Sequence, residues 1–150
     1  MQKTFIMIKP NAVQRNLIGE IITRFEKKGF MINAIKFALV TEEQAKKHYY
    51  VHRERPFYDE LVQSIISNPV VLMVISGNNI IEMSRNFIGA TNPLESSAGT
   101  IRGDFSNDLG MNIIHGSDSL ENAEYEINIY FDKNDIINYK KNLNKDIFSN

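Results

Sequence analysis

The feature that most limits how this chain can fold is its longest apolar run, Val70 to Ile75. Asn68-Pro69 precedes the run and Gly77 follows it, so turn-forming residues bound the segment on both sides. A short, continuous apolar run of this kind is typical of a central strand with both faces covered. It is too short to cross a membrane as a helix. We therefore expect a sheet with this strand inside it.

Strand-like and helix-like segments alternate around this run. Strands are also predicted over residues 4–9, 31–40 and 127–131, the last because apolar and polar residues alternate there. Helices are predicted to begin near residues 17, 41, 56, 80 and 119, where apolar residues recur at helical spacing or capping residues occur. This order favours an α+β fold over a doubly wound sheet. We expect a ferredoxin-like split βαβ sandwich, with a four-stranded antiparallel sheet, helices over it and a long active-site and assembly loop.

Single residues mark several of the helix ends. Asn16 is a candidate N-cap for the first long helix, and Gly29 after two lysines is its stop signal. Thr41 and Gln44 have the spacing of a capping box, in which each residue satisfies the other's backbone N–H group. Pro56 is suited to a first helical turn.

Composition narrows the class of protein. The chain has 150 residues, 43% hydrophobic and 23% charged, which fits one compact domain over residues 1–150. It contains no cysteine, which excludes disulfides, thiolate metal sites and cysteine nucleophiles. A formal net charge of -1 argues against nucleic acid as the primary partner. The amino-terminal run Phe5 to Ile8 is too short for a signal peptide, so we expect a cytoplasmic location.

The segment between residues 90 and 116 keeps neither strand nor helix periodicity, and segments of this length inside compact domains are usually functional. It leads into residues 112–118 (NIIHGSD), where one histidine stands among short polar side chains. An imidazole is the side chain best suited to exchange a group near pH 7, so His115 is the candidate catalytic residue. The alternative is a turn histidine that donates to a backbone carbonyl.

The other two histidines, His48 and His52, lie four residues apart in a predicted helix. That spacing suits two metal ligands, but no H-E-x-x-H pattern and no third ligand accompany them. We therefore interpret them as surface histidines and predict no metal-ligating residues.

The chain lacks both glycine-rich phosphate-binding motifs, G-x-x-x-x-G-K-[ST] and G-x-G-x-x-G. A nucleotide site would have to use side chains, and cations suit phosphate oxygens. The candidates are the cations Lys9, Arg85 and Arg102, the neutral donors Thr91 and Tyr49, and Phe57, either a core anchor or a stacking platform. Taken singly, each is weak evidence, because a lone arginine is more often a solvated surface residue and a tyrosine in an amphipathic helix is more often a core residue.

Several segments, in unbroken order, resemble the motifs of the nucleoside diphosphate kinase family. Residues 112–118 are similar to its active-site signature, and residues 4–10 (TFIMIKP) to its first strand and phosphate-binding lysine. The other similar segments are His48-Tyr49 with 55–57 (RPF), Arg85 with 89–93 (GATNP), 100–104 (TIRGD) and 123–127 (AEYEI). One difference is that Asn11-Ala12 replaces the family's usual Asp-Gly, and alanine fits there only if the backbone avoids positive φ.

The resemblance implies a ping-pong kinase with broad base specificity, in which His115 takes the terminal phosphate of a nucleoside triphosphate and passes it to a nucleoside diphosphate. It implies phosphate binding by Lys9, Tyr49, Arg85, Thr91 and Arg102, sugar contacts by Asn112 and Lys9, base contacts by Phe57, Leu61 and Leu109, and orientation of the site by Ser117 and Glu126. Mg²⁺ would bridge phosphate oxygens with little direct protein ligation. A homo-oligomer is implied, with a hexamer favoured and a tetramer found among relatives, and no membrane partner.

Two other classes of function stay open on the sequence alone. One is a catalytically silent nucleotide-binding module, against which the intact His115 and its three candidate cations count. The other is a single-stranded nucleic-acid binder, which the net charge disfavours. Turnover of a triphosphate with a different diphosphate acceptor separates the enzyme from both.

Overall fold

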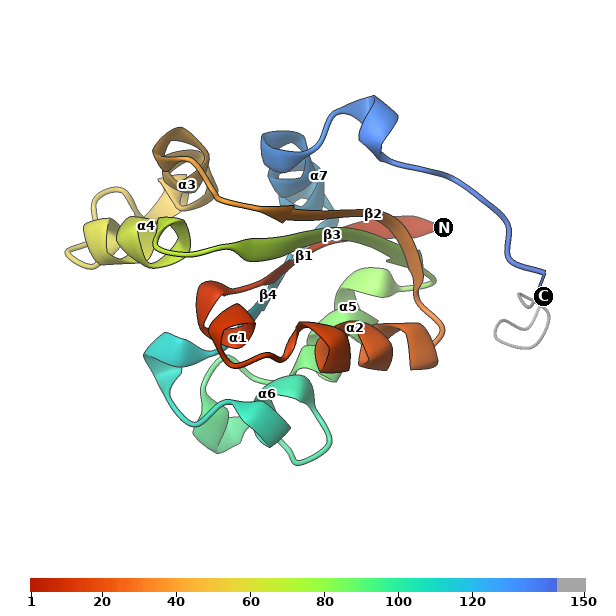
Figure 1. Cartoon of the computed structure of the whole chain (residues 1–150), viewed down its shortest axis with the longest axis horizontal. Coiled ribbons are helices and arrows are strands. Elements are labelled where there is room, and N and C mark those ends of the chain that lie inside the picture. The colour runs from red at the N-terminus through yellow and green to blue at the C-terminus, as the bar shows by residue number, and fades with distance from the viewer. Residues whose placement is uncertain (143–150) are drawn as a thin grey trace.

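The computed structural model describes residues 1–142, which form a four-stranded sheet with helices on both faces (Figure 1). The strands are β1 (Gln2–Ile8), β2 (Met31–Ala38), β3 (Val70–Gly77) and β4 (Ile114–Gly116). The α-helices are α1 (Pro10–Gln14), α2 (Ile18–Lys27), α3 (Glu42–His48), α4 (Tyr58–Ile66), α5 (Ile80–Ile88), α6 (Ile101–Phe105) and α7 (Leu120–Tyr130). Short 3-10 helices are η1 (Tyr50–His52), η2 (Pro93–Glu95), η3 (Leu109–Met111) and η4 (Lys133–Asp135). None of the helices in this part of the chain is long and apolar enough to span a bilayer.

The strands lie in the order β2-β3-β1-β4, and every neighbouring pair is antiparallel. β3 carries the apolar run, lies inside the sheet and is buried along its whole length. The chain runs from β1 through helices to β2 and from β3 through helices to β4, and each time it skips the neighbouring strand. This is the connectivity of a split βαβ sandwich, so the predicted fold class is confirmed.

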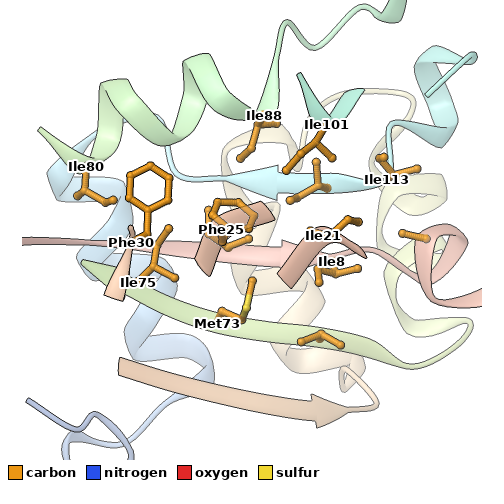
Figure 2. Close-up of a cluster of buried hydrophobic side chains, with 14 residues drawn as sticks. Ile8, Ile21, Phe25, Phe30, Met73, Ile75, Ile80, Ile88, Ile101 and Ile113 are labelled. Carbon is orange, nitrogen blue, oxygen red and sulfur yellow. The ribbon is translucent and has the colours of Figure 1, made fainter. Parts of the chain in front are cut away.

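One face of the sheet is covered by α1, α2, α5 and α6 (Figure 1). Because side chains alternate along a strand, Ile6 and Ile8 of β1 point to this face. They join a buried cluster with Ile21 and Phe25 of α2 and Ile88 of α5. Figure 2 shows this cluster filling the space between the sheet and the helices. Its members are all apolar, so this face holds the fold together.

On the opposite face α7 lies over the sheet, and α3 and α4 lie together at one end of the strands (Figure 1). Phe5 and Met7 of β1 point to this face and pack with Ala45 of α3, Ile65 of α4 and Ile127 of α7. The imidazole rings of His48 and His115 lie beside Phe5 of this second cluster, each with its centroid 6.0 Å from that of Phe5.

The fourth strand is not where the sequence predicted it. Residues 127–131 alternate as a strand would, but α7 runs through most of them. Its buried residues, Ala123, Glu126, Ile127 and Tyr130, recur at helical spacing. The strand prediction was wrong because the stripe that faces the core includes a carboxylate, which hides the helical period of the apolar residues.

The fourth strand is instead β4, inside the segment for which the sequence predicted no regular structure. Three residues are too few to show alternation, and β4 exists because it pairs with β1, where Met7 lies opposite His115. The same segment also forms α6 and two 3-10 helices. It is therefore a series of short helices that ends in a strand and not a structureless loop.

The predicted helix ends are partly confirmed. Thr41 and Gln44 form the capping box, with bonds of 3.0 and 3.1 Å. Gly29, with φ of 94°, follows the end of α2 as predicted. Asn16 is not the N-cap of α2, because Leu17 occupies that position. With φ of 59°, Asn16 instead makes the left-handed turn between α1 and α2.

Candidate active site

The register of β4 against β1 decides where His115 points. His115 lies opposite Met7, so both side chains project toward the face covered by α3 and α7. The ring of Phe5 lies on the same face, with its centroid 6.0 Å from that of His115. The neighbouring residue Ile114 points the other way, into the buried apolar cluster that includes Ile88. The strand thus anchors itself on one face and presents the imidazole on the other.

Glu126 of α7 meets the imidazole there. His115 Nε2 lies 2.6 Å from Glu126 Oε2, and Ser117 Oγ donates to the same oxygen at 3.0 Å. A carboxylate oxygen accepts hydrogen bonds, so Nε2 carries the proton and Nδ1 keeps its lone pair. Within residues 1–142 no hydrogen bond engages Nδ1. The pair therefore fixes the ring and its tautomer and leaves one nitrogen free as a nucleophile.

The backbone before the histidine is strained. Ile113 is fully buried and has φ of 59°, in the left-handed region that a β-branched residue rarely adopts. Arg102, only 6% exposed, supports this turn. Its guanidinium donates to the carbonyl oxygens of Asn112 at 3.3 Å, Gly89 at 3.0 Å and Ile114 at 2.7 Å. A guanidinium has five N–H donors, so it can make these three bonds and still donate to a ligand.

Lys9 follows β1 at the same end of the sheet. Its Nζ donates to Asn112 Oδ1 at 2.7 Å, and its backbone N–H donates to Ile113 O at 2.9 Å. Burial, together with the nearby Arg102, lowers the pKa of Lys9 to about 8. Burial, together with the nearby Arg85, lowers the pKa of Arg102 to about 10. Both groups remain mostly protonated at pH 7, so the site concentrates positive charge that an anion would neutralise.

Arg85 lies in the last turn of α5 and donates to Gly116 O at 3.1 Å, next to the histidine in the chain. Thr91 lies beyond α5 with its side chain exposed. Within residues 1–142 no hydrogen bond ties Thr91 to the other predicted site residues. The structure therefore places Arg85 beside the histidine strand.

The Asn11-Ala12 pair is accommodated beside the site. Ala12 is buried in α1, where its backbone is helical, so the condition for replacing glycine is met. Asn11 Nδ2 donates to Met111 O at 3.0 Å and links α1 to η3.

His48 is not the surface histidine that the sequence suggested. It is half-buried at the end of α3, and its ring centroid lies 4.8 Å from that of His115, with the ring planes at 71°. Its Nδ1 shares a hydrogen bond of 3.1 Å with the hydroxyl of Tyr130. Burial, with His115 and Lys9 nearby, holds the pKa of His48 well below its usual range. His48 is therefore neutral at pH 7.

The helical spacing of α3 could have indicated that His48 faces the core. From the buried Ala45, the residues three and four positions on are His48 and Tyr49, so both belong to the inner face of α3. Tyr49 packs edge-on against His48 with centroids 4.8 Å apart. Burial and the nearby Glu126 raise the pKa of Tyr49 to about 12, so its hydroxyl stays a donor at physiological pH.

The predicted base-binding residues lie on more exposed parts of the chain. Phe57, just before α4, is 45% exposed, Leu109 in η3 is 59% exposed, and Leu61 of α4 is half-buried. The core-anchor interpretation of Phe57 is therefore wrong. Its ring contacts His52, 5.7 Å away between centroids. Within the described residues, no hydrogen bond or ion pair joins these residues to His115.

Three side chains could together hold a metal ion. His48, His115 and Glu126 each offer one ligand atom, and these atoms lie within 4.8 Å of one another. In the described part of the chain, no other group of three such side chains comes together. Mg²⁺ prefers a cage of oxygens, and two imidazoles do not supply one. The residues present therefore do not form a protein cage for Mg²⁺.

An α+β sandwich that presents a histidine with one free nitrogen beside Lys9, Arg85 and Arg102 defines a class, the phosphoryl-transferring enzymes. Comparison with protein families agrees with this, since the family described as "Nucleoside diphosphate kinase" matches residues 2–136. The chain belongs to the nucleoside diphosphate kinase family, and the predicted enzyme class, a nucleotide-binding phosphotransferase, is confirmed.

Similar proteins and structures cover nearly the whole chain. It is 52% identical over 145 residues to the nucleoside diphosphate kinase of Brevibacillus brevis, covering 97% of this chain and 99% of that protein. It is 54% identical over 145 residues to that of Halalkalibacterium halodurans, with the same coverage of both chains. The nucleoside diphosphate kinase of Halobacterium salinarum, solved in complex with CDP, has a TM-score of 0.95 at 41% identity and covers 99% of each chain. A family member from Babesia bovis has a TM-score of 0.96 at 40% identity, covering 99% of this chain and 100% of that one.

Proposed function

We propose that this kinase works through a phosphohistidine on His115. The observation that carries the proposal is the 2.6 Å contact between His115 Nε2 and Glu126 Oε2, which leaves Nδ1 as the nucleophile. In the first half-reaction Nδ1 attacks the γ-phosphorus of a nucleoside triphosphate, the bond to the β-phosphate oxygen breaks, and the diphosphate leaves. In the second, a β-phosphate oxygen of another diphosphate attacks the phosphorus and the P–N bond breaks. Glu126 and Ser117 orient the imidazole through both steps.

The cations would neutralise the phosphates. Lys9 and Arg102 lie at the strained turn before the histidine, and Arg85 contacts the residue after it, so positive charge reaches the imidazole from both sides. Tyr49 and Thr91 would add neutral donors. Because the donor leaves as a diphosphate and the acceptor enters as one, the same groups serve both half-reactions.

The nucleoside would lie toward the exposed end of the site. Asn112, already bonded to Lys9, would donate to the sugar hydroxyls together with that lysine. Phe57 would stack on the base, with Leu61 and Leu109 beside it. A π face serves every base, so we expect broad base specificity. The CDP complex of the Halobacterium salinarum enzyme supports nucleotide binding by this fold.

Mg²⁺ would enter with the nucleotide. It commonly keeps several waters and binds substrate phosphates with few protein ligands, which agrees with a site where cations outnumber free carboxylates. The described residues that surround His115 are therefore expected to bind the phosphates and not the metal.

The same proposal includes a homo-oligomer, a hexamer before a tetramer, in the cytoplasm. β2 is an edge strand, and its exposed Ile35 and Phe37, with Leu39 just beyond, offer an apolar surface of the kind that subunits bury. Leu94 in η2 is 94% exposed. Light scattering at micromolar concentration should return a multiple of the monomer mass, and Pro93→Ser should weaken the assembly. A monomer mass would contradict the proposal.

Mass spectrometry of the intact protein tests the central step. After incubation with ATP and Mg²⁺ and removal of nucleotide, the protein should carry one phosphoryl group, mapped to the peptide containing His115 and unstable to acid. Added GDP or CDP should remove it and yield the triphosphate. A phosphoryl group that mapped to Ser117 would contradict the mechanism.

A further inference from the structure

The phosphoryl-transfer mechanism uses His115 and Glu126 but leaves His48 without a role. His48 comes from α3, His115 from β4 and Glu126 from α7, so three separate elements bring two imidazoles and a carboxylate to one point. We propose that these three side chains form a Zn²⁺ site, and that zinc bound there blocks phosphorylation of His115.

The donor set matches zinc. Two histidines and one glutamate, with the fourth position left to water, is a recurring set of ligands for this ion. Ligand atoms around a tetrahedral zinc ion lie about 3.3 Å apart, given metal–ligand distances of about 2.0 Å. The present spacings are of this size, because His115 Nε2 and Glu126 Oε2 lie 2.6 Å apart and the ligand atoms of the three side chains all lie within 4.8 Å of one another. To admit the ion, the contact between His115 Nε2 and Glu126 Oε2 has to lengthen from its present 2.6 Å.

The surroundings orient the ligands as they do in zinc proteins. Metal-binding histidines usually donate the other ring N–H to a fixed partner. The Nδ1 of His48 already contacts the Tyr130 hydroxyl at 3.1 Å, which leaves its Nε2 for a metal. Glu126 Oε2 is held by Ser117 Oγ at 3.0 Å. The ring of His48 is further restrained by Phe5, 6.0 Å away between centroids.

The same donor set disfavours Mg²⁺, the ion that is expected to accompany the nucleotide. Imidazole nitrogens suit zinc, whereas Mg²⁺ takes oxygens in a strict octahedron. Millimolar Mg²⁺ should therefore leave this site free, and zinc should act at far lower concentrations.

Bound zinc would inactivate His115 Nδ1 as a nucleophile by changing the tautomer of the ring. Zinc takes the lone pair of His115 Nε2, so the single proton of the neutral ring moves from Nε2 to Nδ1 by way of water. Nδ1 then has no lone pair with which to attack phosphorus. This consequence rests on the proposed phosphohistidine mechanism, whereas zinc binding itself does not.

Zinc binding to the nucleotide-free protein is the first measurement. Titration with Zn²⁺ alone, followed by calorimetry, should show one site per chain. His48→Gln should weaken it by about 100-fold, and Tyr130→Phe, which keeps the ring and removes only the hydroxyl, by about 10-fold. His52→Gln, four residues along and outside the cluster, is the matched control and should bind zinc as the parent does. Equal zinc affinity in the parent, His48→Gln and Tyr130→Phe proteins would overturn the site.

The second measurement is phosphoryl incorporation from Mg²⁺-ATP in zinc-buffered solution. Zinc should slow it in the parent and in His52→Gln at the concentration that fills the site, and should need about 100-fold more in His48→Gln, each compared with its own zinc-free rate. Tight zinc binding without inhibition would overturn the proposed block. Absence of phosphohistidine in zinc-free protein that still binds zinc would instead contradict the proposed function and leave the zinc site standing.

Discussion

The proposed phosphate end and the proposed base end of the site differ in how firmly hydrogen bonds within the chain already hold their residues. At the phosphate end, His115, Lys9 and Arg102 are held by hydrogen bonds to Glu126, Asn112 and backbone carbonyls. At the base end, Phe57 and Leu109 project from short surface turns and are 45% and 59% exposed.

The proposed mechanism explains this difference, because it asks different things of the two ends. In-line transfer to an imidazole needs the reacting groups held in one geometry, and a small misplacement is costly. Stacking on a base works with any π face and tolerates movement. Substitutions at the phosphate end should therefore lower kcat, whereas substitutions at the base end should raise KM.

His115→Ala should show the largest effect. It removes the proposed nucleophile, so kcat should fall by at least about 10⁴-fold. The melting temperature should change little, because β4 is anchored by its pairing with β1 and by Ile114. A coupled assay for triphosphate formation checks the first outcome and calorimetry the second, with His52→Ala as control. Retention of most of the activity would show that the phosphate end works without this histidine.

Glu126→Gln should have the second-largest effect on kcat. The amide can also donate, so it no longer forces the proton onto His115 Nε2, and kcat should fall by about 10²- to 10⁴-fold. Glu124→Gln removes a similar charge from the exposed side of the same helix and should leave kcat unchanged. If both variants lost the same activity, helix charge and not tautomer control would explain the effect.

Phe57→Ala, at the proposed base end, should raise KM and leave kcat nearly constant. Loss of a stacking contact worth about 1 to 3 kcal/mol should raise KM by about 5- to 150-fold. The rise should be similar for purine and pyrimidine diphosphates, and kcat should stay nearly constant. Steady-state kinetics with GDP and CDP checks this, and a penalty confined to purines would show that the residue reads the base.

The pH dependence should give the smallest effect. Lys9, with a pKa of about 8, is protonated below that pH and loses its positive charge as the pH rises through it. Phosphate binding to the free enzyme should then weaken, and kcat/KM should fall about 10-fold between about pH 8 and about pH 9.5. A bound nucleotide raises the pKa of the lysine, so kcat should hold to higher pH. Lys9→Arg, which stays charged, should remove this limb of the kcat/KM profile.

Local pattern was enough to predict much of the fold. The apolar run of β3, the capping box at Thr41 and the glycine after α2 are set by residues close together in sequence, and all three were predicted correctly. The segment order also predicted a split βαβ sandwich, because crossover connections need helices between the strands. These features required no knowledge of distant contacts.

The predictions of secondary structure that failed concern segments whose structure depends on contacts with residues far away in the sequence. The helix predicted from residue 119 was expected to end before residues 127–131, which were read as a strand. Its inner stripe carries Glu126, a carboxylate that only its bonds to His115 and Ser117 make acceptable in a buried position. β4 is three residues long and exists only because β1 pairs with it.

By itself, the sequence was enough to predict the candidate residues for the chemistry, because the histidine motif, the lysine at a strand end and the two arginines are properties of residue type and spacing. Only the tertiary structure decided which nitrogen of His115 is free and that His48 joins it. Those facts depend on partners from other elements, Glu126 on α7 for one histidine and Tyr130, 82 residues away along the chain, for the other. A hydrogen bond between side chains is set by distances in space, and the chain has to fold before such distances exist.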